Sequence, residues 1–284
     1  VLQENGYCNL FFMTHESQYD NMNAFLRTNG FDEIYAQENY PSEKVVNSFG
    51  VQDDFMYQYA LPILNERAGT GNPFFSVLLS ISNHPPYVIP PYFHPHSDVL
   101  EEQIVEYADW SIRQFMQAAE KQPWFDNTIF VFLGDHGKMV GTPECEMPQS
   151  YNHIPLMIYG KDIKPGVYDG FGGQVDVSPT LLGLLNISYL QNNFGVNLLE
   201  EERPCMFFTA DNLIGARDSV NMFIYSPDSQ QEFRYKLEEG KLRAATGTDE
   251  EAFRNLKDYC FSMLQSTESL VKEHKTLDKV SVKK

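Results

Sequence analysis

The chain has 284 residues, of which 42% are hydrophobic and 21% are charged, so it can bury a full core and is not a disordered protein. Its formal net charge of −18 argues against nucleic acid or an anionic membrane as its main partner, because both would repel such a surface. The longest apolar runs, FFSVLLSI and IPLMIY, are much shorter than a membrane span of roughly 20 residues and are typical of buried strands.

The first residues, VLQENGYCNLFF, lack the basic start and apolar middle of a signal peptide. They resemble the end of a helix, a glycine stop at Gly6 and a strand, which suggests that further residues precede them in the natural protein. The four cysteines are widely scattered and include no CxxC pair, so they indicate neither a zinc site nor a dense disulfide framework.

Strand-like and helix-like segments alternate over the first 200 residues or so. We expect strands at 8–13, 74–81, 128–134 and 154–160, and helices at 19–30, 50–67, 98–121 and 178–187. Asp20 or Asn21 can cap the first of these helices, and Gly30 can end it. Ser178 can cap the last helix, with Pro179 at its first position. This alternation predicts an α/β fold with a mostly parallel sheet flanked by helices.

The pattern changes after about residue 203. Short strand-like segments separated by turns (CMFFTA, VNMFIYS, EFRYKLE and KLRAATG) predict an antiparallel meander. The chain then closes with an amphipathic helix, for which Thr248 and Glu251 form a capping box. We therefore divide the chain into residues 1–202 and a smaller α+β portion, residues 203–284, packed on the same domain.

Polar residues follow several of the predicted strands, at the strand ends where ligands gather in open α/β sheets. Asp135 and His136, in FLGDHG, offer one hard oxygen and one imidazole nitrogen, a mixture that suits Zn²⁺ or Mn²⁺. The structural alternative is that Asp135 caps the next helix while His136 packs against the sheet. His84, in SNHPPY, is flanked by rigid prolines that would hold its imidazole over a site and let it grip an anionic oxygen, although an ordinary loop histidine is the alternative. His15 follows a strand in the same manner.

The segments GDHG, SNHPPY and GQVDVSPTLLGLLNI, in their order and spacing, resemble the sulfatase and alkaline phosphatase superfamily. GYCNLFFMTHESQYDNMNAFLRTNGFDEIY, GVQDDFMYQYALPIL and FGVNLL are more similar to its lipoteichoic acid synthase and phosphoglycerol transferase branch. The resemblance extends from the first residue to about residue 200. It implies an alkaline-phosphatase-like sheet in a protein anchored to a bacterial membrane through a region N-terminal to this chain, with this part on the extracytoplasmic face.

The resemblance also implies a mechanism. One Mn²⁺ or Zn²⁺ would be held by Asp135 and His136, together with an acid and a nucleophilic threonine from the N-terminal half of the enzyme. His84 would touch the phosphoryl group or protonate the leaving oxygen, and His15 would contact the head group with Tyr19 and Asn21. The reaction would attack a lipid head group of the phosphoglycerol type, form a phosphothreonine intermediate and transfer the group to an acceptor hydroxyl.

The nucleophile and the first acidic ligand are expected upstream of residue 1, since Thr14 lacks the context of a helix-starting nucleophile. This piece is therefore expected to be inactive alone. One alternative is a sulfatase, which would need a CxPxR-like segment not found in this sequence, or a phosphoethanolamine-type transferase. A second alternative is a non-catalytic module, either degenerate or truncated, that keeps the fold without the chemistry.

Overall fold

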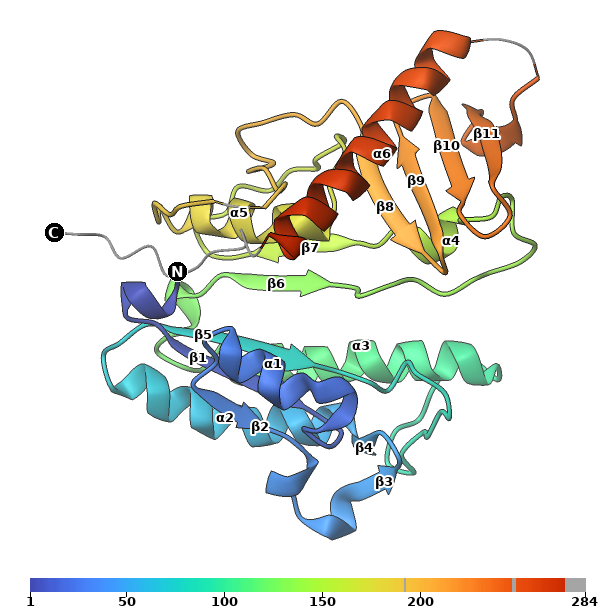
Figure 1. The fold of residues 1–284 in the computed structure, drawn as a ribbon. Helices are drawn as coiled ribbons and strands as arrows, with labels where there is room; N and C mark the ends of the chain where they lie inside the picture. Colours follow the sequence, from blue (N-terminus) through green and yellow to red (C-terminus); the bar gives the residue numbers. More distant parts are fainter. Residues whose placement is uncertain (192, 247–248, 274–284) are drawn as a thin grey trace, which may run out of the picture. The chain divides into compact units, whose positions relative to one another are not determined.

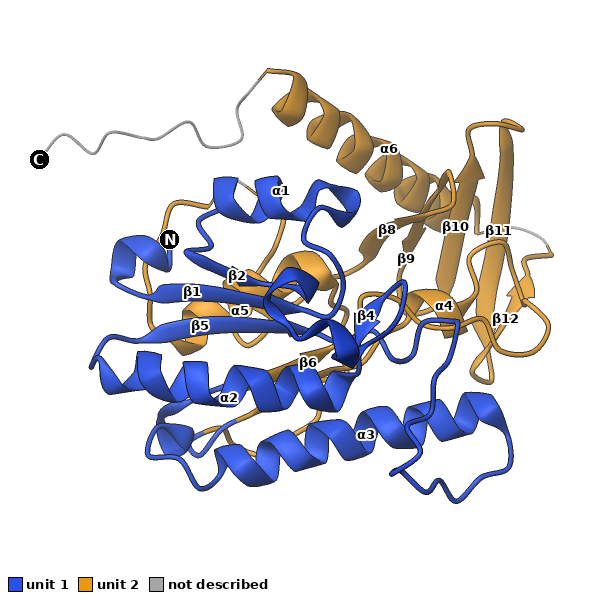
Figure 2. Ribbon diagram, turned by 90° about the horizontal axis from the view of Figure 1, so that it is seen from below, with its two compact units in different colours: residues 1–129, 160–162 blue, residues 130–159, 163–284 orange. Residues whose placement is uncertain are grey.

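The computed structural model describes residues 1–191, 193–246 and 249–273. These residues form two compact units, coloured blue and orange in Figure 2. Unit 1 comprises residues 1–129 and 160–162, and unit 2 comprises the remaining described residues. The division expected near residue 203 stays a prediction, and each unit is described below by itself.

Unit 1 is built on a three-stranded parallel sheet in the order β2–β1–β5 (Figure 1). Its strands are β1 (Cys8–Met13), β2 (Glu33–Tyr35) and β5 (Phe74–Leu79). Because successive side chains of a strand point to opposite faces, Leu10 and Phe12 of β1 pack with helix α2 (Asp53–Gly69). Phe11 and Met13 pack on the other face with α1 (Met22–Thr28). Both faces of the sheet are covered, as the continuous apolar strands predict.

The helices of unit 1 differ in detail from the sequence prediction. Asn21 stands at the N-cap of α1 but has a φ of 60° and makes no side-chain capping bond, so neither it nor Asp20 acts as predicted. Gly30, at φ +86°, closes the turn after the helix as expected. Helix α2 begins later than predicted because Val51 belongs to a short strand, β4 (Gly50–Val51), that pairs with β3 (Val45–Asn47).

The strongly periodic helix is confirmed as α3 (Leu100–Ala119), which packs on α2 and buries Ile104 and Tyr107. Short 3₁₀ turns complete unit 1: η1 (Gln3–Asn5), η2 (Tyr19–Asn21), η3 (Gln37–Asn39), η4 (Ser42–Lys44) and η5 (Phe125–Asn127).

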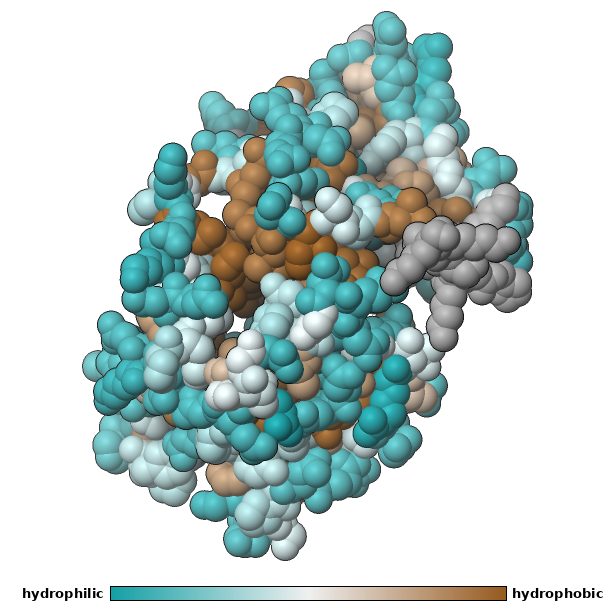
Figure 3. Space-filling view, turned by 90° about the vertical axis from the view of Figure 1, so that its left-hand side faces the viewer, coloured by the Kyte–Doolittle hydropathy of each residue, from teal (hydrophilic) through white to brown (hydrophobic). Residues whose placement is uncertain are grey.

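Unit 2 begins with β6 (Phe130–Leu133) and β7 (Leu156–Tyr159), which pair antiparallel. The α/β prediction is confirmed, but this pair departs from a parallel arrangement because the connecting segment, with short helix α4 (Gln149–Asn152), reverses the chain without a crossover. Leu133, Met157 and Tyr159 of these strands are exposed. Figure 3 shows one face of the molecule, on which hydrophobic residues gather near the centre.

Helix α5 (Gln174–Leu184) starts earlier than predicted, and Ser178 is not its cap. Gly173 stands at the N-cap, and its N–H donates to the Asp176 carboxylate at 2.9 Å, so the helix begins before Ser178 and carries Pro179 in its interior. An acid in the first turn stabilises the start of a helix, so Asp176 sets an earlier start for α5 than Ser178 would.

The predicted meander is confirmed as a five-stranded antiparallel sheet in the order β12–β11–β10–β9–β8. Its strands are β8 (Met206–Ala210), β9 (Leu213–Arg217), β10 (Asn221–Ser226), β11 (Gln231–Glu238) and β12 (Lys241–Ala244), of which β9 was not predicted. Helix α6 (Glu250–Lys272) covers one face through Phe253, Leu256 and Cys260. Cys145 and Met147 pack on the other face.

Asp249 is the N-cap of α6, where its Oδ1 accepts from the Ala252 N–H at 3.3 Å. Thr248, the predicted cap, lies outside the described residues. Within the ranges that the structure describes, no helix is long and apolar enough to cross a lipid bilayer.

Candidate functional site

Four aromatic rings in unit 1 form a continuous row, which we call the ring cluster: His15, Tyr19, Phe49 and His84. The centroids of His15 and Tyr19 are 5.0 Å apart, those of Tyr19 and Phe49 are 6.5 Å apart, and those of Phe49 and His84 are 4.4 Å apart. The structure therefore brings together three of the residues selected from the sequence, and Phe49 is the link between them.

His15 is fixed at the end of β1. It is only 4% exposed, and its Nδ1 lies 3.0 Å from the carbonyl oxygen of Glu16. The turn that follows is held by Glu38, whose Oε1 accepts from both the N–H and the hydroxyl of Ser17 at 3.0 Å. The His15 ring is thus held by its neighbours before any ligand arrives.

His84 lies on the exposed loop after β5, with its Nδ1 2.7 Å from the carbonyl oxygen of Pro85. A carbonyl oxygen only accepts hydrogen bonds, so in the neutral ring Nδ1 carries the proton and Nε2 keeps its lone pair. The same argument applies to His15, and both rings can therefore offer Nε2 to a ligand.

Tyr19 and Asn21 lie on the turn that leads into α1. Tyr19 is 53% exposed and joins the ring cluster, whereas Asn21 is exposed at the N-cap of the helix. Phe49 was missed by the sequence reasoning. The glycine after it is the signal that could have found it: Gly50 has a φ of +92°, and a Cβ there would meet the Thr14 carbonyl oxygen at 1.7 Å, so the chain beside Phe49 passes directly against the end of β1.

Asp135 and His136 follow β6 in unit 2. The Asp135 Oδ2 and His136 Nε2 atoms are 3.9 Å apart, and the His136 Nδ1 lies 2.7 Å from the Gly137 carbonyl oxygen, so Nε2 is again the atom with a lone pair. Two ligands of one tetrahedral ion with bonds of about 2.1 Å lie roughly 3.4 Å apart. The donor types and their spacing therefore fit a shared divalent cation after a small side-chain rotation.

The backbone around this pair is held closely. The Gly137 N–H donates to the Tyr151 carbonyl at 2.8 Å, and the Tyr151 ring stacks on His136 with centroids 5.1 Å apart. A Cβ on Gly137 would meet the Ser150 carbonyl oxygen at 2.1 Å, so only glycine fits there. From α5, the Gln174 Nε2 donates to the Asp135 carbonyl at 2.8 Å. The His136 ring thus packs on Tyr151.

The described ranges contain no cluster of three or more His, Cys, Asp or Glu side chains that could hold a metal ion. Asp135 and His136 would supply two ligands, whereas zinc sites have at least three from the protein. The ring cluster and the Asp135–His136 pair lie in different units, and the convergence of His84 with that pair stays a prediction.

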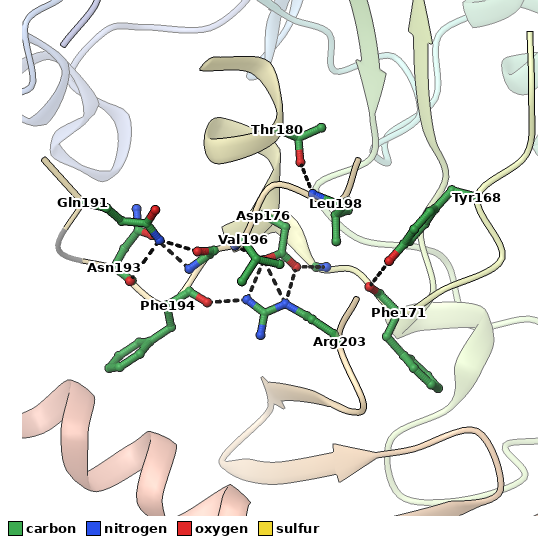
Figure 4. A network of polar contacts seen from close by, with 12 residues as sticks. Tyr168, Phe171, Asp176, Thr180, Gln191, Asn193, Phe194, Val196, Leu198 and Arg203 are labelled. Atoms are coloured by element: carbon green, nitrogen blue, oxygen red, sulfur yellow. Dashed lines mark hydrogen bonds and ion pairs between the residues drawn. The ribbon is translucent and has the colours of Figure 1, made fainter. Parts of the chain in front are cut away.

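Asp176, from the VDVSPT segment, has a structural role (Figure 4). It is 0% exposed and accepts from the Gly173 and Val196 N–H groups at 2.9 and 2.8 Å and from the Arg203 guanidinium, with an Nη2–Oδ1 distance of 2.5 Å. Arg203 also donates to the Phe194 carbonyl. Burial alone would lower the pKa of Arg203, but its hydrogen bonds and ion pair with Asp176 outweigh burial and raise that pKa. The motif therefore fixes the start of α5.

Comparison with known proteins places these residues in context. The family model described as Sulfatase matches residues 1–187. Among curated proteins, the chain is 24% identical over 251 residues to lipoteichoic acid synthase 2 of Bacillus subtilis, which covers 76% of this chain and 37% of that protein. It is 25% identical over 238 residues to phosphoglycerol transferase I of Xanthomonas campestris, which covers 79% of this chain and 34% of that protein. The chain thus spans little more than a third of these relatives.

Two solved structures share the fold over nearly the whole chain. A protein of the alkaline phosphatase superfamily from Vibrio parahaemolyticus has a TM-score of 0.83 and 27% identity, covering 96% of this chain and 67% of its own. The lipoteichoic acid synthase LtaP from Listeria monocytogenes has a TM-score of 0.78 and 24% identity, covering 95% and 71%. The expected alkaline-phosphatase-like architecture is therefore confirmed.

Proposed function

Because the chain belongs to the sulfatase family, we propose that it is part of an extracytoplasmic, metal-dependent transferase that acts on phosphoglycerol or a related head group. The names of its curated relatives, lipoteichoic acid synthases and phosphoglycerol transferases, support this substrate class. The observation that carries the proposal is shared by His15, His84 and His136: each ring turns Nδ1 to a backbone carbonyl and keeps Nε2 for a ligand.

In this proposal Asp135 and His136 hold one Mn²⁺ or Zn²⁺. When bound, such an ion lowers the pKa of a nucleophilic hydroxyl and neutralises charge that develops on phosphorus. The nucleophile and the further metal ligands would come from other residues of the whole protein. The Gly137 and Gln174 contacts would keep the carboxylate and imidazole in place.

The ring cluster would bind and orient the head group. In the protonated ring, His84 Nε2–H would donate to a phosphoryl oxygen or give its proton to the leaving oxygen. His15 Nε2, the Tyr19 hydroxyl and the Asn21 amide would contact the glycerol-phosphate portion. Because His15 is held by its own turn and His84 by its carbonyl and Phe49, little rotamer freedom would be lost on binding.

The test uses the full-length protein that contains this chain. Asp135→Ala is expected to remove the metal, measured by elemental analysis, and to abolish release of the head group, because the remaining ligands would no longer complete the coordination shell. Asp109→Ala, which changes an exposed i,i+4 ion pair, is the matched control and should change neither. Unchanged metal content in Asp135→Ala would refute the ligand assignment, and turnover of a sulfate ester in place of the phosphodiester would favour a sulfatase.

A further inference from the structure

The loop that carries His84 is held at its start by a carboxylate that the proposed chemistry does not use. The Asp53 Oδ1 accepts from the Ile81 N–H at 2.9 Å and from the Ser82 N–H at 3.2 Å. The His84 N–H in turn donates to the Ile81 carbonyl at 2.8 Å. Asp53 therefore bonds the same residue whose carbonyl closes the turn at His84.

The far side of the loop is held by the same segment of chain. Asn47 donates through Nδ2 to the Pro86 carbonyl at 3.2 Å, and Gln52 donates through Nε2 to the Val88 carbonyl at 3.1 Å. Residues of the two segments line one hollow, among them Phe49, Ile81, Ser82 and His84. Segment 47–53 thus hydrogen-bonds both ends of segment 81–88. The Phe49 ring packs on His84, between these two sets of hydrogen bonds.

Packing alone does not explain why Asp53 is buried, because burying a carboxylate is costly. It is 1% exposed, and burial raises the pKa of its carboxyl, although the N–H groups of Ile81 and Ser82 oppose that shift. Asp53 forms no ion pair with any residue that the structure describes, and its hydrogen bonds come from backbone amides. A buried carboxylate without a cation is unfavourable unless several donors surround it, and here the donors are the loop amides and the N-terminus of α2.

The neighbouring acid, Asp54, is also buried but bonds a different part of the chain. Asp54 accepts from the hydroxyl of Tyr107 at 2.5 Å and from that of Tyr92 at 2.9 Å. Burial and the Asp54 carboxylate raise the pKa of Tyr92 to about 12, so its phenol stays protonated and donates. Asp54 therefore bonds Tyr92, further along the connection between β5 and α3, and Tyr107 of α3, whereas Asp53 bonds the amides at the start of that connection, next to His84.

We propose that Asp53 is a positioning residue for His84: it holds the two amides that begin the loop and so fixes where the imidazole stands. The proposal rests on the function given to His84 above. Loss of the carboxylate would free Ile81 and Ser82 and let the ring leave Phe49. A displacement of about 1 Å in a catalytic group is enough to reduce turnover about 100-fold.

The first experiment compares Asp53→Asn with Asp54→Asn in the 284-residue chain, by hydrogen exchange and by the NMR shifts of the His84 ring. Asp53→Asn should speed amide exchange at Ile81 and Ser82 by at least about 10-fold, the loss of a charge-assisted bond. It should also move the His84 ring signals, whereas Asp54→Asn should do neither. Equal exchange in the two variants would overturn the proposal.

A measurement on the unaltered chain covers the case in which Asp53→Asn does not fold. The amide protons of Ile81 and Ser82 should shift together with the titration of the Asp53 carboxyl carbon, because that carboxylate is their acceptor. Amide shifts that ignore this titration would overturn the proposal without any variant.

The activity of the full-length protein distinguishes the positioning role of Asp53 from the catalytic role of His84. Asp53→Asn should lower kcat at least about 10-fold while KM and metal content stay near their original values, and Asp54→Asn should retain kcat. Slow turnover with unchanged loop exchange would overturn the positioning role of Asp53. A loosened loop with normal turnover would instead show that His84 has no part in the reaction, which would refute its place in the proposed function.

Discussion

Asp53 in unit 1 and Asp176 in unit 2 are both almost completely buried carboxylates in the first turn of a helix, but they are neutralised differently. Arg203 forms an ion pair with Asp176 through its planar guanidinium. Among the described residues, Asp53 accepts from the Ile81 and Ser82 backbone amides and forms no ion pair. Asp176 therefore stabilises the fold through an ion pair, whereas Asp53 holds a loop through hydrogen bonds.

Each of these acids bonds the backbone of a segment that leads to a proposed site residue. Asp53 holds the loop of His84, whereas Asp176 fixes the start of α5, from which Gln174 reaches the backbone of Asp135. In unit 2 the cation of the ion pair keeps its charge near neutral pH, since a guanidinium stays protonated. The support in unit 1 depends on the charge of a carboxyl whose pKa is raised.

Removing the cation from Asp176 gives the largest expected effect. Arg203→Ala leaves a buried carboxylate unpaired and should lower the free energy of unfolding by about 3–5 kcal/mol, measured by urea denaturation. Arg113→Ala, which breaks an exposed i,i+4 pair with Asp109, is the control and should change it by about 0.5 kcal/mol or less. A loss from Arg203→Ala no larger than that of the control would mean that Asp176 needs no cation, and the contrast with Asp53 would disappear.

The parts of the fold that the sequence predicts well are those in which local pattern and tertiary packing agree. Helix α3 keeps its apolar residues on one side, and its ends differ from the prediction by two residues each. Ser178 failed as a helix start because Asp176 provides an earlier one, and β9 was missed because its centre, Ile214-Gly215-Ala216, has small residues and little alternation. The antiparallel direction of β6 and β7 was not predicted, because no local pattern encodes it.

In the candidate site, too, local sequence pattern predicts some residues, whereas others depend on tertiary packing. Asp135 and His136 are adjacent in sequence, so their pairing needs no tertiary information. His15 and His84 follow the parallel neighbours β1 and β5, and the rule for strand ends predicts that they share an edge. Phe49 and Asp53 could not be found in this way, since their contacts with residues 81–84 depend on how distant segments pack.

The pH dependence of stability tests the other side of the comparison. Because burial raises the pKa of Asp53 above the ordinary value of 3.8, the folded chain holds this proton more tightly than the unfolded chain. The contribution of this group is therefore full below the ordinary pKa and is lost as the pH rises through the folded pKa. The unfolding free energy of the unaltered chain, minus that of Asp53→Asn, should fall above pH 4 by at most about 1.4 kcal/mol per pH unit. A difference that stays flat or rises with pH would contradict the burial argument.

The smallest expected effect sharpens the link between Asp176 and the acid–histidine pair. Gln174→Ala removes hydrogen bonds from an exposed amide to the Gly134 and Asp135 carbonyls, at 3.2 and 2.8 Å. Net bonds of this kind are worth about 0.5–1.5 kcal/mol, so Mn²⁺ affinity in the full-length protein should fall about 3- to 10-fold, measured by calorimetric titration. Gln122→Ala, which removes a bond to the carbonyl of Ala118 in unit 1, is the matched control and should leave the affinity unchanged. If both variants bind Mn²⁺ like the unaltered protein, α5 does not hold Asp135 in place, and Asp176 supports the fold alone.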